Sequence, residues 1–416
     1  MFSTTQKPTP MEKSRKLIAN ILNQLEGLNV CRRRFMEHIF LLILIMRGRH
    51  NFLGLSRYGV YNERSYRDNY EKDFDFMAFN IALSQNHLSG HTVLALDPSY
   101  ISKSGKSTPN IDYFYSGCAR KSLRGLEITG LALIDIENNT GFHLLSVQTP
   151  NKKTLEAKDW TRIDHYADMV TSRAHELGQM ADYLCVDGFF AKKKFVDAIL
   201  EKTPLHLISK LRNDANLRYL NHARPTGKPG RPKLYDGKID TRKVDKRRIK
   251  KVHQDDQVAL YEGVVYHVQL KRKIKLCYIE FLTDGEPNGR VQFLFSTDLK
   301  QGGLQIYLFY KARFQIEFIF RDAKQFTGLN HCQARTQGKL HFHHNASLTA
   351  VNIAKAVFHL DKPKDERTSF SMADVKTELL NEYMLEIFIS NLEIDPNSDK
   401  IRKVKRRIRR LGKIAA

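Results

Sequence analysis

The alternation of hydrophobic and polar residues divides the chain into a helical first part and a later part that contains strands. Residues 10–90 repeat apolar positions mostly at helical spacing, and the aliphatic run at 39–46 is typical of a buried helix. From residue 91 onward, short apolar runs of strand length replace this pattern. They predict three strands, the last two joined by a hairpin at the turn sequence ENNTG, and then helix, strand, helix and strand.

This order predicts an α/β fold with a mixed sheet and helices on its faces. The expected strands lie within HTVLALD, LEITGLALIDIENNTGFHLLSVQT, DYLCVD and LHLISKL, and Asp97 and Asp187 each end one of these runs. Residues 154–179 are expected to form one long amphipathic helix that holds the only tryptophan, Trp160. The sheet therefore brings acidic residues to the ends of buried strands, where mixed sheets usually carry their chemistry.

Residues 212–295 interrupt the alternation and are expected to form a β-rich insertion. They contain a basic loop rich in proline and glycine, a basic run at 242–251, and three later runs with strand character. The chain is therefore expected to have five parts: 1–90, an N-terminal helical DNA-binding region; 91–211, the first part of the core; 212–295, the insertion; 296–360, the second part of the core; and 361–416, a helical, basic C-terminal tail.

The stretch YKARFQIEFIFRDAK, residues 310–324, is expected to form one helix, because it contains neither glycine nor proline. At about 100° per residue, its polar residues Tyr310, Arg313, Glu317 and Lys324 fall within an arc of about 60°. An apolar stripe lies beside them, formed by Ala312, Ile316, Ile319, Phe320 and Ala323. The polar edge is either a solvated surface in which cations offset Glu317 or a functional site.

The formal net charge of +23 predicts a polyanionic partner, most simply DNA or RNA. A membrane is not expected, since the longest aliphatic run is too short to span a bilayer. The N-terminus does not have the layout of a signal peptide. The five cysteines are scattered without a CxxC pair, which favours a reducing cytoplasm over a disulfide framework.

Two segments are candidates for contact with nucleic acid. Residues 51–70 resemble a helix-turn-helix, with Ser56 and Asn62 as expected N-caps and with Arg57, Arg64 and Arg67 near the second helix. The alternative is a small helical bundle with a basic surface. In the insertion, Arg231 and Lys233 belong to a short Arg-Pro segment that suits either a minor groove or backbone phosphates.

The C-terminal segment 400–413 has nine basic residues in fourteen and apolar residues at nearly helical spacing. It is either a basic amphipathic helix that contacts phosphates or a solvated tail.

Two other motifs lead to weaker hypotheses. One is a cluster of five possible zinc ligands: His331, Cys332, His341, His343 and His344. Zinc sites usually take paired ligands from two arms, which this cluster does not supply, so polar loop histidines are expected instead. The sequence SKSGKST at 102–108 lacks the glycine spacing of a phosphate-binding loop, so no use of ATP is expected.

The strongest chemical hypothesis joins Asp97 and Asp187 with Glu317. Three carboxylates close together raise one another's pKa, and divalent cations relieve that repulsion. Hard cations such as Mg²⁺, with Mn²⁺ as a substitute, prefer oxygen ligands of this kind. Two such ions about 4 Å apart promote in-line phosphoryl transfer, and Arg313 and Lys324 would then hold neighbouring phosphates.

These residues resemble a known family. The spacing Tyr310-x₂-Arg313-x₃-Glu317-x₆-Lys324 is similar to the Tyr-Arg-Glu-Lys signature of the insertion-sequence-four group of bacterial DDE transposases. Asp97 in LALDPSYISKSGK and Asp187 in VDGFF resemble that group's first and second acid regions. The resemblance covers roughly residues 90–350.

The resemblance implies an RNase H-like core interrupted by a β-strand insertion. It further implies an Mg²⁺-dependent nuclease and strand transferase that moves its own insertion sequence by a cut-and-paste route. Asp97, Asp187 and Glu317 would be the catalytic metal ligands, and Tyr310, Arg313 and Lys324 would contact the DNA.

The expected partners are double-stranded DNA, at the terminal inverted repeats and the target, and a second copy of the chain in a paired-end complex. The expected location is the bacterial cytoplasm, in association with the nucleoid. A stacking aromatic for a DNA hairpin would be Phe293 or Phe295, since Trp160 lies outside the insertion. The alternatives are a catalytically silent, transposase-derived DNA-binding protein and another RNase H-like DNA nuclease.

Overall fold

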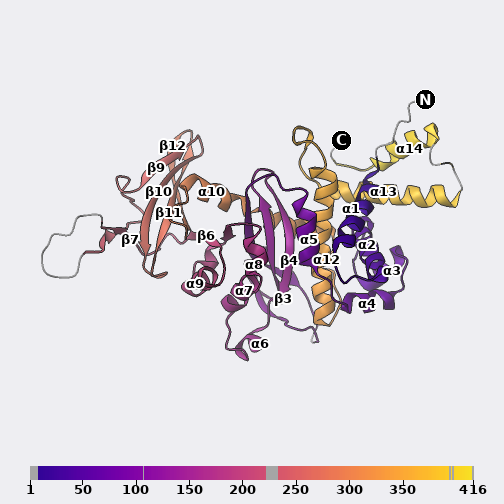
Figure 1. Ribbon diagram of the computed structural model, residues 1–416, viewed down its shortest axis with the longest axis horizontal. Helices are drawn as coiled ribbons and strands as arrows, with labels where there is room; N and C mark the ends of the chain where they lie inside the picture. Colours follow the sequence, from indigo (N-terminus) through magenta and orange to yellow (C-terminus); the bar gives the residue numbers. More distant parts are fainter. Residues whose placement is uncertain (1–7, 106, 222–232, 393–394, 396–397, 415–416) are drawn as a thin grey trace.

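The computed structural model describes residues 8–105, 107–221, 233–392, 395 and 398–414. The molecule is elongated, as Figure 1 shows. Helices from both ends of the chain gather at one end, the β-rich insertion forms the other end, and the central sheet lies between them.

The central sheet has the order β4-β3-β1-β5-β6. The pairs β3–β4 and β1–β3 are antiparallel, whereas β1–β5 and β5–β6 are parallel. Three antiparallel strands followed by two parallel strands in this order form an RNase H-like sheet, so the predicted mixed α/β fold is confirmed. The strands are β1 (Thr92–Ser102), β2 (Asp112–Ser116), β3 (Lys121–Asp135), β4 (Thr140–Gln148), β5 (Tyr183–Val186) and β6 (His206–Leu211).

The hairpin predicted at ENNTG joins β3 to β4. Asn139 has a φ of 45°, a left-handed conformation that asparagine tolerates better than most residues. β3 is buried without interruption from Gly125 to Asp135, because helices cover both of its faces. This long buried strand forms the middle of the site described below.

Helices pack on both faces of the sheet. On one face α7 contacts β3, where the Tyr166 hydroxyl donates a 2.6 Å hydrogen bond to Glu127 Oε1. On the other face lie α5, α11 and α12. The bounds of the core helices are α5 (Phe76–Gln85), α6 (Lys152–Glu156), α7 (Arg162–Thr171), α8 (Ala174–Gly178), η1 (Gly188–Phe190), α9 (Lys193–Lys202), α10 (Gly303–Ala312), α11 (Gln315–Phe326) and α12 (Gln337–Lys355).

The single helix predicted at 154–179 is wrong, because α6, α7 and α8 divide that segment. Asp159 has a φ of 53°, which ends the first helical stretch. Thr161 then begins α7 with a capping box that it shares with Asp164. Trp160 therefore lies in a connection and not within a helix.

The insertion continues the central sheet. Phe293–Ser296 of β12 pair antiparallel with β6, so the inserted strands extend from the edge of the core. The runs predicted as strands do lie in β10, β11 and β12. The strands are β7 (Leu217–Leu220), β8 (Tyr235–Lys238), β9 (Lys250–Gln254), β10 (Val258–His267), β11 (Arg272–Thr283) and β12 (Glu286–Ser296).

The N-terminal region consists of helices packed beside the core. The aliphatic run at 39–46 lies almost wholly in α2 and is largely buried, as predicted. Asn62 caps α4 as predicted, but Ser56 lies inside α3, and Asn51 is the cap of that helix. The helices are α1 (Pro10–Gln24), α2 (Val30–Ile45), α3 (Phe52–Tyr58) and α4 (Glu63–Glu71).

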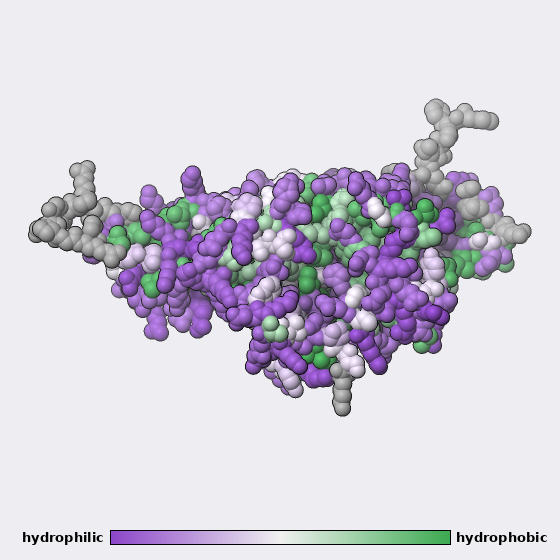
Figure 2. Space-filling view, turned by 60° about the horizontal axis from the view of Figure 1, so that its bottom comes forward, coloured by the Kyte–Doolittle hydropathy of each residue, from purple (hydrophilic) through white to green (hydrophobic). Residues whose placement is uncertain are grey.

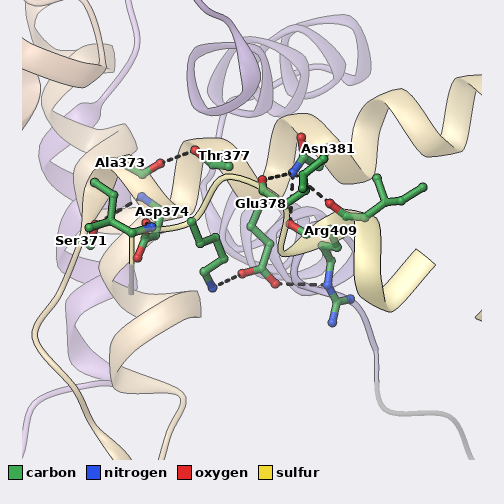
Figure 3. Close-up of polar contacts among 11 residues, drawn as sticks. Ser371, Ala373, Asp374, Thr377, Glu378, Asn381 and Arg409 are labelled. Atoms are coloured by element: carbon green, nitrogen blue, oxygen red, sulfur yellow. Dashed lines mark hydrogen bonds and ion pairs between the residues drawn. The ribbon is translucent and has the colours of Figure 1, made fainter. Parts of the chain in front are cut away.

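The C-terminal helices lie next to the N-terminal ones. η2 (Ala356–Leu360) and η3 (Lys364–Glu366) follow α12, and then come α13 (Met372–Asn391) and α14 (Asp399–Arg409). The basic C-terminal segment is thus a helix. Figure 3 shows how α13 holds it: the Glu378 carboxylate pairs with Arg409, and the Asn381 side chain reaches the backbone at the end of α14.

One hydrophobic cluster runs from the N-terminal helices through the sheet into the insertion and α13. The division of the chain into five parts therefore stays a prediction. Among the helices of the described residues, none is long and apolar enough to cross a membrane.

Candidate catalytic site

A tightened helical turn places Arg313 and Glu317. The single helix predicted at 310–324 is wrong, since α10 ends at Ala312 and α11 begins at Gln315. Arg313 keeps helical angles (φ −47°, ψ −33°), but hydrogen bonds across the junction span three residues, as between Glu317 N and Phe314 O at 3.0 Å. The junction is thus a 3₁₀-like turn between two helices.

The predicted apolar stripe holds α11 against the sheet. Ile316, Ile319, Phe320 and Ala323 are buried where α11 contacts β1, β3 and β4. The Phe320 ring lies directly over Gly130 of β3, where an added Cβ would come within 2.6 Å of the ring. The absence of a side chain at Gly130 therefore allows the helix to approach closely.

Asp97 lies inside β1, and the expectation that it ends its strand is wrong. The last residue pair between β1 and β5 is Leu96 with Val186, so the parallel pairing stops one residue before Asp97. The pairing with β3 continues to Ser102, with Asp97 opposite Gly130. Asp97 therefore projects from the sheet at the point where β1 and β5 separate, on the face that α11 covers.

Asp187 is the first residue after β5, as predicted. Its carboxylate caps η1 by accepting a hydrogen bond from the Gly188 backbone at 2.5 Å, and the residue is exposed. Parallel pairing of β5 with β1 brings this strand end beside Asp97.

Arg313 lies between the acids. Its Nη2 atom donates to Glu317 Oε1 at 3.0 Å, and its Nη1 atom is 4.0 Å from Asp97 Oδ1. The Arg313 side chain is 6 % exposed, whereas that of Glu317 is 41 % exposed. Asp97 and Glu317 therefore meet around one buried guanidinium group, and Asp187 is near enough to act on its charge.

The pKa of Asp97 shows the electrostatic cost of this arrangement. Burial raises it from 3.8 to about 7; Arg313 opposes the rise, and the Glu317 and Asp187 carboxylates add to it. Glu317 and Asp187 thus both lie close enough to influence Asp97.

The three residues predicted to contact DNA lie beside the acids. Burial raises the pKa of Tyr310 to about 12, and its ring centre is 5.5 Å from the Arg313 guanidinium carbon. Lys324 is half-buried, and burial lowers its pKa although the nearby Cys118 and Asp97 oppose the shift. The Nε and Nη1 atoms of Arg313 are buried without a hydrogen-bond acceptor among the described residues. These donors suit an anion such as a phosphate.

The donor atoms of the three acids suit a hard divalent cation, because all are carboxylate oxygens. Within the part of the chain that the structure describes, however, no three histidine, cysteine, aspartate or glutamate side chains are placed to hold one ion together. Arg313 occupies the space between Asp97 and Glu317 instead. The oxygen donors of these acids would suit such an ion, and their assignment as metal ligands stays a prediction.

The other predicted DNA contacts lie away from the acids. All three arginines of α3 and α4 are exposed. Arg64 lies 3.9 Å from Asp68, and Arg67 pairs with Glu63 and packs over the Phe52 ring at 4.7 Å. In the insertion, Lys233 is exposed and pairs with Asp236 at 3.0 Å. Arg231 lies outside the described residues.

Two sequence-based interpretations are wrong. His343 and His344 are buried inside α12 and are not loop residues; the His343 Nε2 atom lies 2.8 Å from the Gly328 carbonyl oxygen. Phe293 and Phe295 are fully buried in β12, so neither can stack on a DNA base.

Sequence reasoning also missed three aromatic residues at the site. Phe189 follows Asp187 closely, and Phe314 and Phe318 flank Glu317; they are 46 %, 48 % and 41 % exposed. Their positions in the sequence, close to Asp187 and Glu317, could have indicated them.

Comparison with known proteins gives the class of enzyme but does not test the individual site residues. Residues 150–353 match the family model described as a transposase DDE domain, a segment that contains Asp187 and Glu317. The chain is therefore an enzyme of the class that cuts and joins DNA strands. More particularly, its function is that of a DNA transposase, and the matched segment is similar to the DDE domain of such enzymes.

No curated protein matches the chain. Among solved structures, a similar one is the cryo-EM structure of the piggyBac transposase synaptic complex with hairpin DNA. That similarity has 11 % identity and a TM-score of 0.40, and it covers 96 % of this chain and 82 % of that one.

Proposed function

We propose that Asp97, Asp187 and Glu317 are the catalytic acids of this transposase and that they hold Mg²⁺ ions, with Mn²⁺ as a substitute. The observation that carries the proposal is the convergence of these acids around Arg313. Three segments far apart in the chain supply them, in the order expected for a DDE enzyme. Bound divalent ions would activate the attacking oxygen and stabilise the leaving oxygen at a phosphodiester.

The chain's own residues bind and orient the DNA in this proposal. Arg313 has two buried donors to spare, which suit a non-bridging phosphate oxygen beside the acids. Lys324, near Asp97, supplies a second cation for an adjacent phosphate. Tyr310 packs against the Arg313 guanidinium and limits its movement.

The exposed rings beside the acids are the candidates for stacking on a displaced base. Phe314 and Phe318 lie on the outer side of α11, next to Glu317. We propose these two residues for base stacking because Phe293 and Phe295 are buried.

The finer biological role rests on the sequence signature. The spacing from Tyr310 to Lys324 supports membership of the insertion-sequence-four group. The proposed activity is cut-and-paste movement of an insertion sequence between its terminal inverted repeats and a target. Two copies of the chain, one for each end, would form the paired complex.

Replacing one acid tests the proposal. We expect Glu317→Gln to lower Mn²⁺-dependent nicking of supercoiled plasmid by at least about 100-fold, because a charge that stabilises the transition state is removed. Binding of the DNA flanking the coding region, followed by fluorescence anisotropy, is expected to change little. Thermal melting checks that the variant is folded.

The matched control is Glu201→Gln, which changes an exposed glutamate at the end of α9. It is expected to nick plasmid like the unaltered protein. Undiminished nicking by purified Glu317→Gln would remove this residue from the mechanism.

A further inference from the structure

β3 extends beyond the rest of the central sheet, and β2 pairs with this extension. β4 pairs with β3 only as far as Ile128. Farther along the same edge, Tyr113 of β2 lies opposite Arg124, and Tyr115 lies opposite Ser122. The pairing forms a hairpin at the end of the catalytic sheet.

The register shows which face of the sheet the two tyrosines occupy. Gly130 faces α11, since Phe320 of that helix lies over it. Side chains alternate along a strand, so Arg124 and its partner Tyr113 share the face of Gly130. Asp97, opposite Gly130, projects from this face as well. Tyr115, two residues after Tyr113 in β2, lies on this face by the same alternation.

The opposite face of the hairpin is covered. Phe114 is fully buried, and the Arg162 guanidinium of α7 lies 4.5 Å from the centre of its ring. Tyr113 and Tyr115, by contrast, are 62 % and 60 % exposed. The hairpin therefore has one face packed on the protein and one face with two exposed aromatic rings.

The exposed face has the chemistry of a platform for single-stranded nucleic acid. Side chains two residues apart on a strand are about 7 Å apart, near twice the spacing of stacked bases. Neither tyrosine hydroxyl has a hydrogen-bond partner among the residues that the structure describes. Arg124 is exposed on the same face, and Arg120 is exposed in the turn of the hairpin. Aromatic rings next to cations bind unpaired bases and their phosphates.

A cation connects this face with the acids. α11 begins beside Asn139, at the β3–β4 turn, crosses Gly130, and thus ends toward the hairpin. Lys324, in its last turn, is near enough to both Asp97 and Cys118 of the hairpin loop for them to oppose the lowering of its pKa by burial. Arg124 lies six positions before Gly130 along β3, a distance of about 20 Å.

We propose that Tyr113 and Tyr115 bind the unpaired bases of the DNA strand that leads from the catalytic acids past Lys324. This site deepens the proposed function and rests on it. Its ligand is an unpaired segment of DNA beside the scissile phosphate, and the tyrosine rings stack on its bases.

The test compares two DNA probes of the same sequence, one fully paired and one with a forked end of unpaired thymines. Binding is measured by fluorescence anisotropy without divalent metal. We expect Tyr113→Ala/Tyr115→Ala to bind the forked probe about tenfold more weakly, the order expected when stacking is removed. Affinity for the paired probe should change less than about twofold.

The matched control is Tyr113→Phe/Tyr115→Phe, which keeps both rings and is expected to bind the fork like the unaltered protein. Equal weakening on both probes, or none on the fork, would overturn the proposal. If the double alanine variant does not fold, the single variants Tyr113→Ser and Tyr115→Ser replace it, with the same expected selectivity for the fork.

The same measurement in Glu317→Gln separates this site from the catalytic proposal. Tyrosine-dependent fork binding is expected to persist there, whether or not Glu317 is needed for cleavage. Loss of nicking without loss of fork preference would thus support both proposals. Undiminished nicking by the Glu317→Gln variant would contradict the catalytic proposal alone.

Discussion

Asp97 is the residue at which burial and charge conflict most directly. Its pKa rises to about 7, first because of burial and then because Glu317 and Asp187 are near, while Arg313 opposes the rise. The folded protein thus holds a proton that the unfolded chain would release near pH 4. Between these values folding takes up a proton, so the contribution of Asp97 to stability falls as pH rises.

This linkage predicts a pH dependence that Asp97→Asn removes. In the presence of a chelator, the melting temperature of the unaltered protein minus that of Asp97→Asn should fall from about pH 4 to about pH 7 and then become constant. Added Mn²⁺ should raise the melting temperature of the unaltered protein above pH 7, because the ion replaces the proton. A difference that does not vary with pH would contradict a raised pKa.

At the scale of elements, the distance between α11 and the sheet decides where Glu317 lies. Gly130 leaves room for the Phe320 ring, and a Cβ there would come within 2.6 Å of it. Gly130→Ala is therefore expected to push α11 outward and to cost about 1–3 kcal/mol of stability, as other overpacked cores do. Plasmid nicking should fall more than DNA binding, because Glu317 moves with the helix.

Two further variants test this explanation. Gly263→Ala is the control, since its added Cβ would meet Ile249 at an ordinary 3.4 Å. It is expected to change stability by less than about 0.5 kcal/mol. Phe320→Leu, combined with Gly130→Ala, should restore part of the stability and of the nicking. Full nicking by Gly130→Ala alone would show that α11 adapts without moving its acid.

The elements also show what sequence could predict. The succession of core strands along the chain, Asp187 at a strand end and the apolar stripe of α11 follow from local patterns of burial, which the sequence displays. Asp97 inside β1 does not, because the strand continues past Pro98 only through its long-range pairing with β3.

The division between α10 and α11 was not predictable for a similar reason. Neither glycine nor proline marks it; α10 packs on the insertion strands while α11 packs on the core sheet. Phe293 and Phe295 were misplaced because β12 lies between β6 and β11 and is fully buried where these residues lie. Tertiary packing, which no local pattern records, decided each case.

At the scale of the whole molecule, the net charge of +23 is spread over a long, largely polar surface. Figure 2 shows one face on which hydrophilic side chains predominate and apolar ones gather near the middle. At one end of the molecule, α14 carries much of the charge and has no buried residue. The contacts in Figure 3 attach this helix to α13: Glu378 pairs with Arg409 at 3.1 Å and with Lys413 at 2.6 Å.

Because α14 is held in place, its cations form a fixed surface for phosphates. We expect replacement of Lys403, Arg406, Arg407 and Arg410 by glutamine to weaken DNA binding at all sequences. A plot of log affinity against log salt concentration should become less steep. The magnitude of its negative slope should decrease by up to about 3.6, or about 0.9 for each phosphate that the helix no longer neutralises. Fluorescence anisotropy over a salt series measures this slope.

The control changes the net charge equally but at scattered exposed positions, with glutamine at Lys271, Lys300, Lys362 and Lys364. If α14 contacts DNA directly, this control should reduce the slope far less than the variant of α14. Equal reductions would mean that the total charge of the molecule, and not the placement of α14, attracts DNA. Because α13 anchors α14 through Glu378, Glu378→Gln should give an intermediate slope: the cations remain, but the helix is held less firmly.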